Sequence, residues 1–162
     1  MIGNSVTQTV LRNPIHFISF GFGVGLSPIA PGTMGTLIAI PIFLALTTFS
    51  LSIYLLFVTI IFFVGCWASG LTAKALGVPD HSGIVIDEIV GYLITMILVP
   101  VTWYWVILGF LLFRLFDIWK PWPVCVADRQ VKGGLGIMLD DVLAALYSLL
   151  SLHIVIWSVN FL

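Results

Sequence analysis

The sequence predicts an all-α fold: an integral membrane helical bundle with four to five membrane segments. Of its 162 residues, 60% are hydrophobic and only 8% are charged, whereas a soluble domain carries about 25% charged residues. The apolar residues gather in long runs, as membrane helices require, and most charged residues lie between these runs. The length fits one domain, residues 1–162. A net charge of −1 argues against nucleic-acid binding, which needs a dense basic surface.

Two helical hairpins account for most of the apolar sequence. Residues 36–49 and 51–67 are apolar and uncharged, and they predict a first hairpin that turns at residues 47–52. The next apolar stretch, residues 84–116, is broken by Pro100 and an aromatic cluster that follows it closely. Proline interrupts helices, and Trp and Tyr rings favour the membrane interface, so a second hairpin is expected to turn there.

A last apolar run covers residues 142–162 and begins directly after Asp140 and Asp141. Carboxylates are favoured at a helix N-terminus by the helix dipole, so a final helix is expected to start there. In a plainer interpretation, Asp140 only caps this helix through backbone N–H groups. A full span needs about 20 apolar residues and several runs are shorter, which leaves the number of segments at four or five.

The acidic residues are confined to one part of the chain, residues 80–141. They are Asp80, Asp87, Glu88, Asp117, Asp128, Asp140 and Asp141. Asp87 precedes Pro100 by 13 residues and Asp117 follows Tyr104 by 13 residues, so the second hairpin would place both about 20 Å from its turn. The Lys and Arg residues are expected on the same side of the membrane. Since cytoplasmic loops carry the excess of positive charge, this side should face the cytoplasm.

These carboxylates predict a cation site. Adjacent Asp87 and Glu88 repel each other beside apolar sequence unless a cation or protons relieve them, and a divalent metal is the simplest solution. The expected ligands are Asp87, Glu88, Asp117, Asp140 and Asp141, with Asp80 and Asp128 in flanking loops. Two simpler roles stay open: Asp87 and Glu88 only mark a solvated helix start, and Asp117 only pairs with Arg114.

A Gly/Pro-rich segment, residues 21–36, opens directly into the first apolar helix. Backbone N–H groups, hydroxyls and a helix N-terminus can together bind phosphate without formal charge. The candidate phosphate-binding residues are Ser27, Gly32, Thr33, Gly35 and Thr36, and the candidate phosphate-binding cations are Lys120 and Arg129. The spacing matches neither a Walker P-loop nor a Rossmann fingerprint. Alternatively, the glycines serve only close helix packing, where glycine is also frequent.

The three histidines differ in their expected position. His81 lies beside Asp80 and shortly before Asp87, where it could act as a general acid or base, although such a loop histidine is often only a surface residue. His16 and His153 are expected far from the acidic cluster and are assigned no role.

Four motifs, in this order, resemble the phosphatidylglycerophosphatase A family. They are SPIAPGTMGT (27–36), DHSGIVIDE (80–88), FRLFDIWKPWP (113–123) and DRQVKGGLGIMLDD (128–141). The resemblance implies an all-helical enzyme of the bacterial inner membrane that removes the terminal phosphate of phosphatidylglycerophosphate, giving phosphatidylglycerol, with Mg²⁺. Its implied partners are the lipid substrate and the bilayer, with no obligate protein partner.

The mechanism expected from these residues is attack of a metal-bound water on the phosphomonoester. One or two Mg²⁺ ions would be held by Asp87 or Glu88, with Asp117 and Asp141, and a spare carboxylate or His81 would transfer protons. Lys120, Arg129 and the backbone of residues 32–36 would neutralise phosphoryl charge. The alternative function is a cation channel or transporter, which would place the carboxylates near the bilayer midplane. A purely structural membrane subunit is a third possibility.

Overall fold

The computed structural model describes residues 2–160, with side chains from residue 6 onward, and within this part the chain is helical with no β-strand. The elements are α1 (Ile2–Arg12), α2 (Pro14–Ser19), the 3-10 turn η1 (Val24–Leu26), α3 (Pro31–Leu46), α4 (Leu51–Leu76), α5 (Ile86–Thr95), α6 (Trp103–Trp119), α7 (Val124–Gln130) and α8 (Gly133–Asn160). The predicted all-α fold is confirmed.

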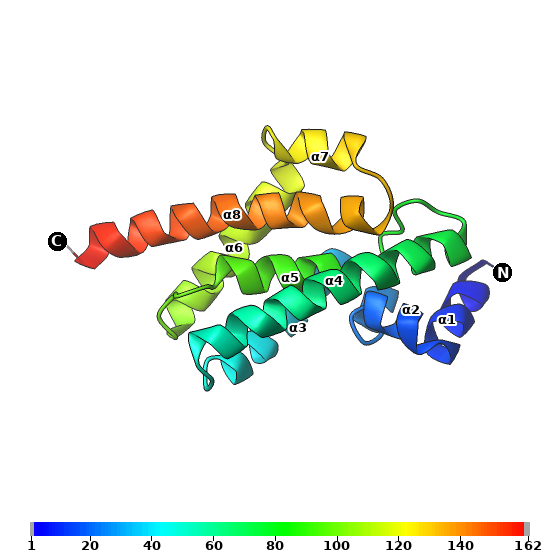
Figure 1. Cartoon of the computed structure of the whole chain (residues 1–162), viewed down its shortest axis with the longest axis horizontal. Helices are drawn as coiled ribbons and strands as arrows, with labels where there is room; N and C mark the ends of the chain where they lie inside the picture. Colours follow the sequence, from blue (N-terminus) through cyan, green and yellow to red (C-terminus); the bar gives the residue numbers. More distant parts are fainter. Residues whose placement is uncertain (1, 161–162) are drawn as a thin grey trace.

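Both predicted hairpins are present. The first consists of α3 and α4, joined by residues 47–50, and the second consists of α5 and α6, joined by residues 96–102. In the second turn, Leu98 adopts a left-handed backbone with φ of 59° and is followed by Pro100, which cannot continue a helix. Figure 1 shows α5 lying between α4 and α8, while α7 covers the first turns of α8.

The predicted start of the last helix is wrong. α8 begins at Gly133, so Asp140 and Asp141 lie about two turns inside it and neither caps it. Gly133 has a φ of +74°, a conformation that glycine adopts without steric cost. A Cβ on the next residue, Gly134, would lie 1.7 Å from the carbonyl oxygen of Cys66 in α4. These glycines therefore let α8 start early, directly against the backbone of α4.

The central helix of the bundle is α5. Seven of its ten residues are buried, and it packs against α3, α4, α6 and α8. Two hydrogen bonds connect it to neighbouring helices: the Tyr54 hydroxyl donates to the Leu93 carbonyl at 2.6 Å, and the Tyr92 hydroxyl donates to the Val106 carbonyl at 3.1 Å. A short helix in this position brings its first turn, with Asp87, into the interior of the bundle.

Two helices of the described chain, α4 and α8, are long and apolar enough to cross a membrane. Only 22% of the most apolar window of α4 and 28% of that of α8 is buried, whereas a core helix of a soluble protein would be mostly buried. The outward side chains of α4 include Leu56, Phe63 and Trp67, each more than half exposed. Such an apolar surface is typical of helices that contact lipid or another protein.

Candidate active site

A polar pocket of about 290 Å³ lies at the end of the bundle where α3, α5 and α8 begin and α6 ends. Its lining residues are Ala30, Pro31, Gly32, Asp80, Ser82, Ile84, Asp87, Glu88, Arg114, Asp117, Lys120, Ile137, Asp140 and Asp141. All five expected metal ligands are therefore brought to one pocket, although their role as ligands stays a prediction. Asp80, expected only in a flanking loop, lines the same pocket.

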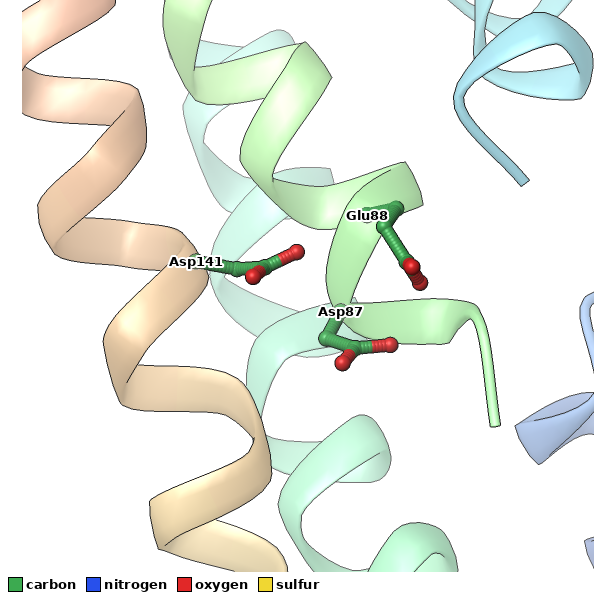
Figure 2. A group of neighbouring side chains, drawn as sticks. All are labelled: Asp87, Glu88 and Asp141. Carbon is green, nitrogen blue, oxygen red and sulfur yellow. The ribbon is translucent and has the colours of Figure 1, made fainter. Parts of the chain in front are cut away.

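Three carboxylates form the centre of the pocket. Oxygen atoms of Asp87, Glu88 and Asp141 all lie within 4.8 Å of one another, and Figure 2 shows Asp141 reaching from α8 toward the first turn of α5. Asp87 Oδ1, Glu88 Oε2 and Asp141 Oδ2 are buried and have no hydrogen-bond partner in the described chain. Buried carboxylate oxygens at this spacing repel one another when they are ionised. A cation or bound protons between them would remove this repulsion.

Arg114 and Asp117 form an ion pair at one side of this centre. Arg114 Nη1 lies 2.7 Å from Asp117 Oδ2 and 3.6 Å from Glu88 Oε1, and all three side chains are largely buried. Asp117 lines the same pocket as Asp141. The pairing considered as an alternative is thus present, but it leaves Asp117 in the pocket. Arg114 was not expected as a site residue, although one arginine in an apolar helix three residues before Asp117 could have indicated it.

Lys120 binds two further carboxylates. Its ammonium lies 2.6 Å from Asp140 Oδ2 and also contacts Asp128. Burial lowers the pKa of Lys120, but these two carboxylates outweigh that effect and raise the pKa above its ordinary value, so Lys120 stays charged. Asp128, expected in a flanking loop, lies on α7 and is connected to the pocket through this lysine.

Of the five predicted phosphate-binding residues in segment 21–36, only Gly32 lines the pocket, together with its neighbours Ala30 and Pro31. A Cβ at Gly32 would lie 2.1 Å from Glu88 Oε1, so the first turn of α3 is in direct contact with the central carboxylates. The Thr36 hydroxyl is buried and donates to the Gly32 carbonyl within the helix, and Gly35 packs against Val85. Ser27 forms a local turn by donating to the Ile29 carbonyl.

The other predicted residues lie around the pocket. Thr33, partly buried, and His81 are both outside its lining. His81 Nδ1 accepts a hydrogen bond from the Gly83 N–H at 3.0 Å, which makes it part of the loop structure. Arg129 is exposed and lines a neighbouring pocket of about 230 Å³ that shares Asp80 and Asp140 with the first. The structure therefore gives Thr33, His81 and Arg129 no direct place beside the central carboxylates.

Comparison with known proteins gives the family. The family model described as phosphatidylglycerophosphatase A matches residues 17–156. The chain belongs to the phosphatidylglycerophosphatase A family. All residues that line the carboxylate pocket fall within the matched range.

Three relatives of this phosphatidylglycerophosphatase A family member are informative. A phosphatidylglycerophosphatase A of Escherichia coli (strain K12) is 47% identical over 139 residues, which cover 85% of this chain and 81% of the relative. One of Haemophilus influenzae is 41% identical over 149 residues, 91% of either chain. A protein of Bacteroides thetaiotaomicron, provisionally named a phosphatidylinositol-3-phosphatase, is 43% identical over 151 residues, 88% of this chain and 94% of the relative. No solved structure matches the chain.

Proposed function

We propose that this protein hydrolyses the terminal phosphomonoester of phosphatidylglycerophosphate and releases phosphatidylglycerol. Membership of the phosphatidylglycerophosphatase A family supports the reaction, and two of the relatives carry that name. The observation that carries the proposal is the pocket itself, in which buried, unpartnered carboxylate oxygens face a helix N-terminus and an arginine. A channel is not supported, because the carboxylates gather in one pocket at one end of the bundle rather than along a path through it.

The central carboxylates fit Mg²⁺, which prefers oxygen ligands. Asp87, Glu88 and Asp141 would hold the ion, since each has a buried oxygen without a hydrogen-bond partner and these three residues can place ligand oxygens within 4.8 Å of one another. Asp117 could complete the site, because it lines the same pocket beside Glu88 and Asp141. When bound, Mg²⁺ would supply charge neutralisation at the phosphoryl oxygens and lower the pKa of a coordinated water.

The surrounding residues orient the phosphoryl group. The first turn of α3, at Pro31 and Gly32, presents a helix N-terminus to the pocket, which favours an anion. Arg114 lies beside this helix start, since its Nη1 would be 3.1 Å from a Cβ added at Gly32, and its guanidinium would bind phosphoryl oxygens in the same space. Asp117, already paired with Arg114, can accept the proton of the attacking water.

We further propose that the protein resides in the bacterial inner membrane with the pocket toward the cytoplasm. The supporting observation is that Lys120, Arg129 and Lys132 lie at the pocket end of the bundle. Four to five membrane segments follow if α3 and α6 join α4 and α8, with α5 as a short buried segment among them. α3 has 16 residues and α6 has 17, which gives each a length of about 25 Å, slightly below the bilayer hydrocarbon thickness.

The function is tested by phosphate release from purified protein in mixed micelles. The substrates compared are phosphatidylglycerophosphate, phosphatidic acid, phosphatidylinositol 3-phosphate and a soluble phosphomonoester, each with Mg²⁺ or with excess EDTA. We expect phosphatidylglycerophosphate to be the best substrate and EDTA to abolish release. A preference for phosphatidylinositol 3-phosphate or for the soluble ester would contradict the substrate, and activity in EDTA would contradict the metal.

Substitution of single carboxylates tests the site. Asp87→Asn, Asp117→Asn and Asp141→Asn should each lower kcat by roughly 100-fold or more, because each removes a charge from the reacting centre. Asp128→Asn is the matched control: Asp128 lies outside the pocket and its side chain is 34% exposed, so its loss should be much smaller. An equal fall in kcat for all four variants would contradict a catalytic role that is specific to the three pocket carboxylates.

A further inference from the structure

A buried chain of polar side chains connects α2 with α4, away from the carboxylate pocket. Thr72 Oγ1 lies 2.8 Å from His16 Nδ1 and 3.0 Å from Ser19 Oγ. Thr72 and Ser19 are fully buried and His16 is 7% exposed. Burial of polar groups among apolar helices is costly unless they bond one another, so this chain marks a fixed contact between α2 and α4.

The hydrogen bonds of Thr72 can all be satisfied at once. Its oxygen also lies 2.8 Å from the Ala68 carbonyl. A hydroxyl offers one proton and two lone pairs. Thr72 can therefore donate to Ala68 while it accepts from the imidazole N–H of His16 and from the hydroxyl of Ser19. Removal of this single hydroxyl would leave two buried polar groups without their partner.

Ser19 continues the connection to the active-site helix through its backbone. Its carbonyl accepts a hydrogen bond from the Val85 N–H at 3.0 Å, and Val85 is the residue directly before α5. The Val85 side chain is fully buried. Cβ atoms added at Gly21 and Gly35 would each lie 2.7 Å from it. The backbone of Val85 is therefore fixed by Ser19, and its side chain is fixed by close packing against Gly21 and Gly35. The helical turn that carries Asp87 begins at the next residue.

The loop before α5, residues 81–85, also packs against residues 20–25. A Cβ at Gly25 would lie 1.9 Å from the Gly83 carbonyl oxygen, so the two backbones are in direct contact. The ring of Phe20 packs against that of His81, with centroids 5.5 Å apart. Gly21 and Gly25 thus allow close approach to the loop at residues 81–85, which accounts for these two glycines without a bound phosphate.

We propose that His16, Ser19 and Thr72 form a positioning network that holds the N-terminal turn of α5 and thereby sets Asp87 and Glu88 against Asp141. None of the three network residues lines the pocket, so the network acts through Val85 rather than on the substrate. The inference rests on the proposed function for its kinetic readout and on the proposed metal site for its Mn²⁺ readout, whereas the exchange readout depends on neither.

The test substitutes Thr72, with a control on the same helix. Thr72→Val removes the hydroxyl at nearly constant volume, and Thr72→Ser restores it. Thr59→Val is the matched control, because Thr59 donates to the Leu55 carbonyl at 2.8 Å and has no His or Ser partner in the described structure. Two readouts are independent of activity: amide hydrogen exchange of the peptide 82–90, and Mn²⁺ binding measured by electron paramagnetic resonance. The third readout is kcat and KM for the lipid.

For Thr72→Val we expect exchange of the peptide 82–90 to become roughly tenfold faster, as loss of one to two buried hydrogen bonds would produce. Mn²⁺ affinity and kcat should each fall by roughly fivefold, with the lipid KM changed by less than about twofold, because a displaced carboxylate weakens the metal site but not lipid binding. Thr72→Ser and Thr59→Val should behave as the unmodified protein. If Thr72→Val does not fold, Ser19→Ala provides the same test with smaller changes.

A Thr72→Val protein with a lower melting temperature but unchanged exchange at 82–90 and unchanged Mn²⁺ affinity would overturn the network, since only general stability would depend on it. Equal changes in Thr59→Val, or no recovery in Thr72→Ser, would overturn it as well. If the unmodified protein released no phosphate from any lipid, the proposed function would fail, while the exchange and Mn²⁺ measurements would still decide the network.

Discussion

Lys120 illustrates how single residues organise the site. It ends α6 in a left-handed conformation with φ of 47°, which turns its side chain toward Asp128 and Asp140. The sequence pattern alone assigns this lysine to the substrate phosphate. In the structure its ammonium neutralises two carboxylates. Of the three central carboxylates, Asp87 and Asp141 have no ion pair in the described chain, and Glu88 lies 3.6 Å from Arg114 Nη1.

Substitution of Lys120 should therefore destabilise the protein. In Lys120→Met, Asp140 remains buried without its cation, and we expect the free energy of unfolding to fall by about 1–3 kcal/mol. Asp128→Asn removes only the more exposed partner and should cost less than about 1 kcal/mol. Thermal unfolding in detergent measures both values. A larger effect for Asp128→Asn than for Lys120→Met would contradict this assignment.

The carboxylate positions could be predicted at the residue scale because charge is so rare in this chain. Asp87, Glu88 and Asp117 could be placed from their distance to a predicted turn. Arg114 was missed as a site residue, since sequence spacing showed a local pair with Asp117 but not the contact with Glu88, which lies on another helix.

At the scale of the helices, the contact between α4 and α8 depends on two glycines with different surroundings. A Cβ at Gly134 would meet backbone atoms, 1.7 Å from the Cys66 oxygen and 2.8 Å from the Gly70 nitrogen. A Cβ at Gly65 would meet only the end of a flexible side chain, 2.7 Å from Met138 Sδ. Backbone cannot move aside without shifting a whole helix, whereas a methionine can change rotamer.

These surroundings predict different tolerance to alanine. Gly134→Ala should lower the free energy of unfolding by about 3 kcal/mol or more, because α4 and α8 must separate to accept the methyl group. Gly65→Ala should cost less than about 1.5 kcal/mol, since alanine also favours the helix. Thermal melting of both variants in one detergent makes the comparison. The prediction is wrong if Gly65→Ala is the less stable protein.

The same contact accounts for the unpredicted start of α8. The apolar run that indicated a helix begins only at residue 142, but α8 starts at Gly133 because its first turns pack on α4 and α7. The two hairpins were predictable because their turns carry local signals such as Pro100. Contacts between distant backbones, such as Gly25 with Gly83, leave only a glycine in the sequence, with no indication of its partner.

At the scale of the whole molecule, the pocket and the α3–α4 turn lie at opposite ends of the bundle. α3 begins at the pocket and runs away from it, so residues 47–50, which follow α3, lie at the far end. With the proposed orientation, the two ends of the protein would face different compartments. Cys125 on α7, close to the pocket end, is a native probe for one side.

Labelling with a membrane-impermeant maleimide tests this orientation. In a Cys66→Ser background, Cys125 should be labelled in inverted vesicles and protected in spheroplasts. In a background with both cysteines replaced by serine, Thr48→Cys should show the opposite pattern, because Thr48 is exposed in the far turn. Labelling of both positions from one side would contradict a membrane-spanning bundle, and a reversed pattern would contradict a cytoplasmic pocket.

The length of α8 bears on how a lipid headgroup could reach the carboxylates. Its 28 residues extend about 42 Å, roughly 12 Å more than the hydrocarbon layer of a bilayer. Asp140 and Asp141 lie about 11–12 Å from the first residue of the helix. If the C-terminal end of α8 is level with the far surface, the surplus length places both carboxylates at the boundary between hydrocarbon and headgroups. A phospholipid could then present its phosphate to the site by lateral diffusion, with its acyl chains remaining in the membrane.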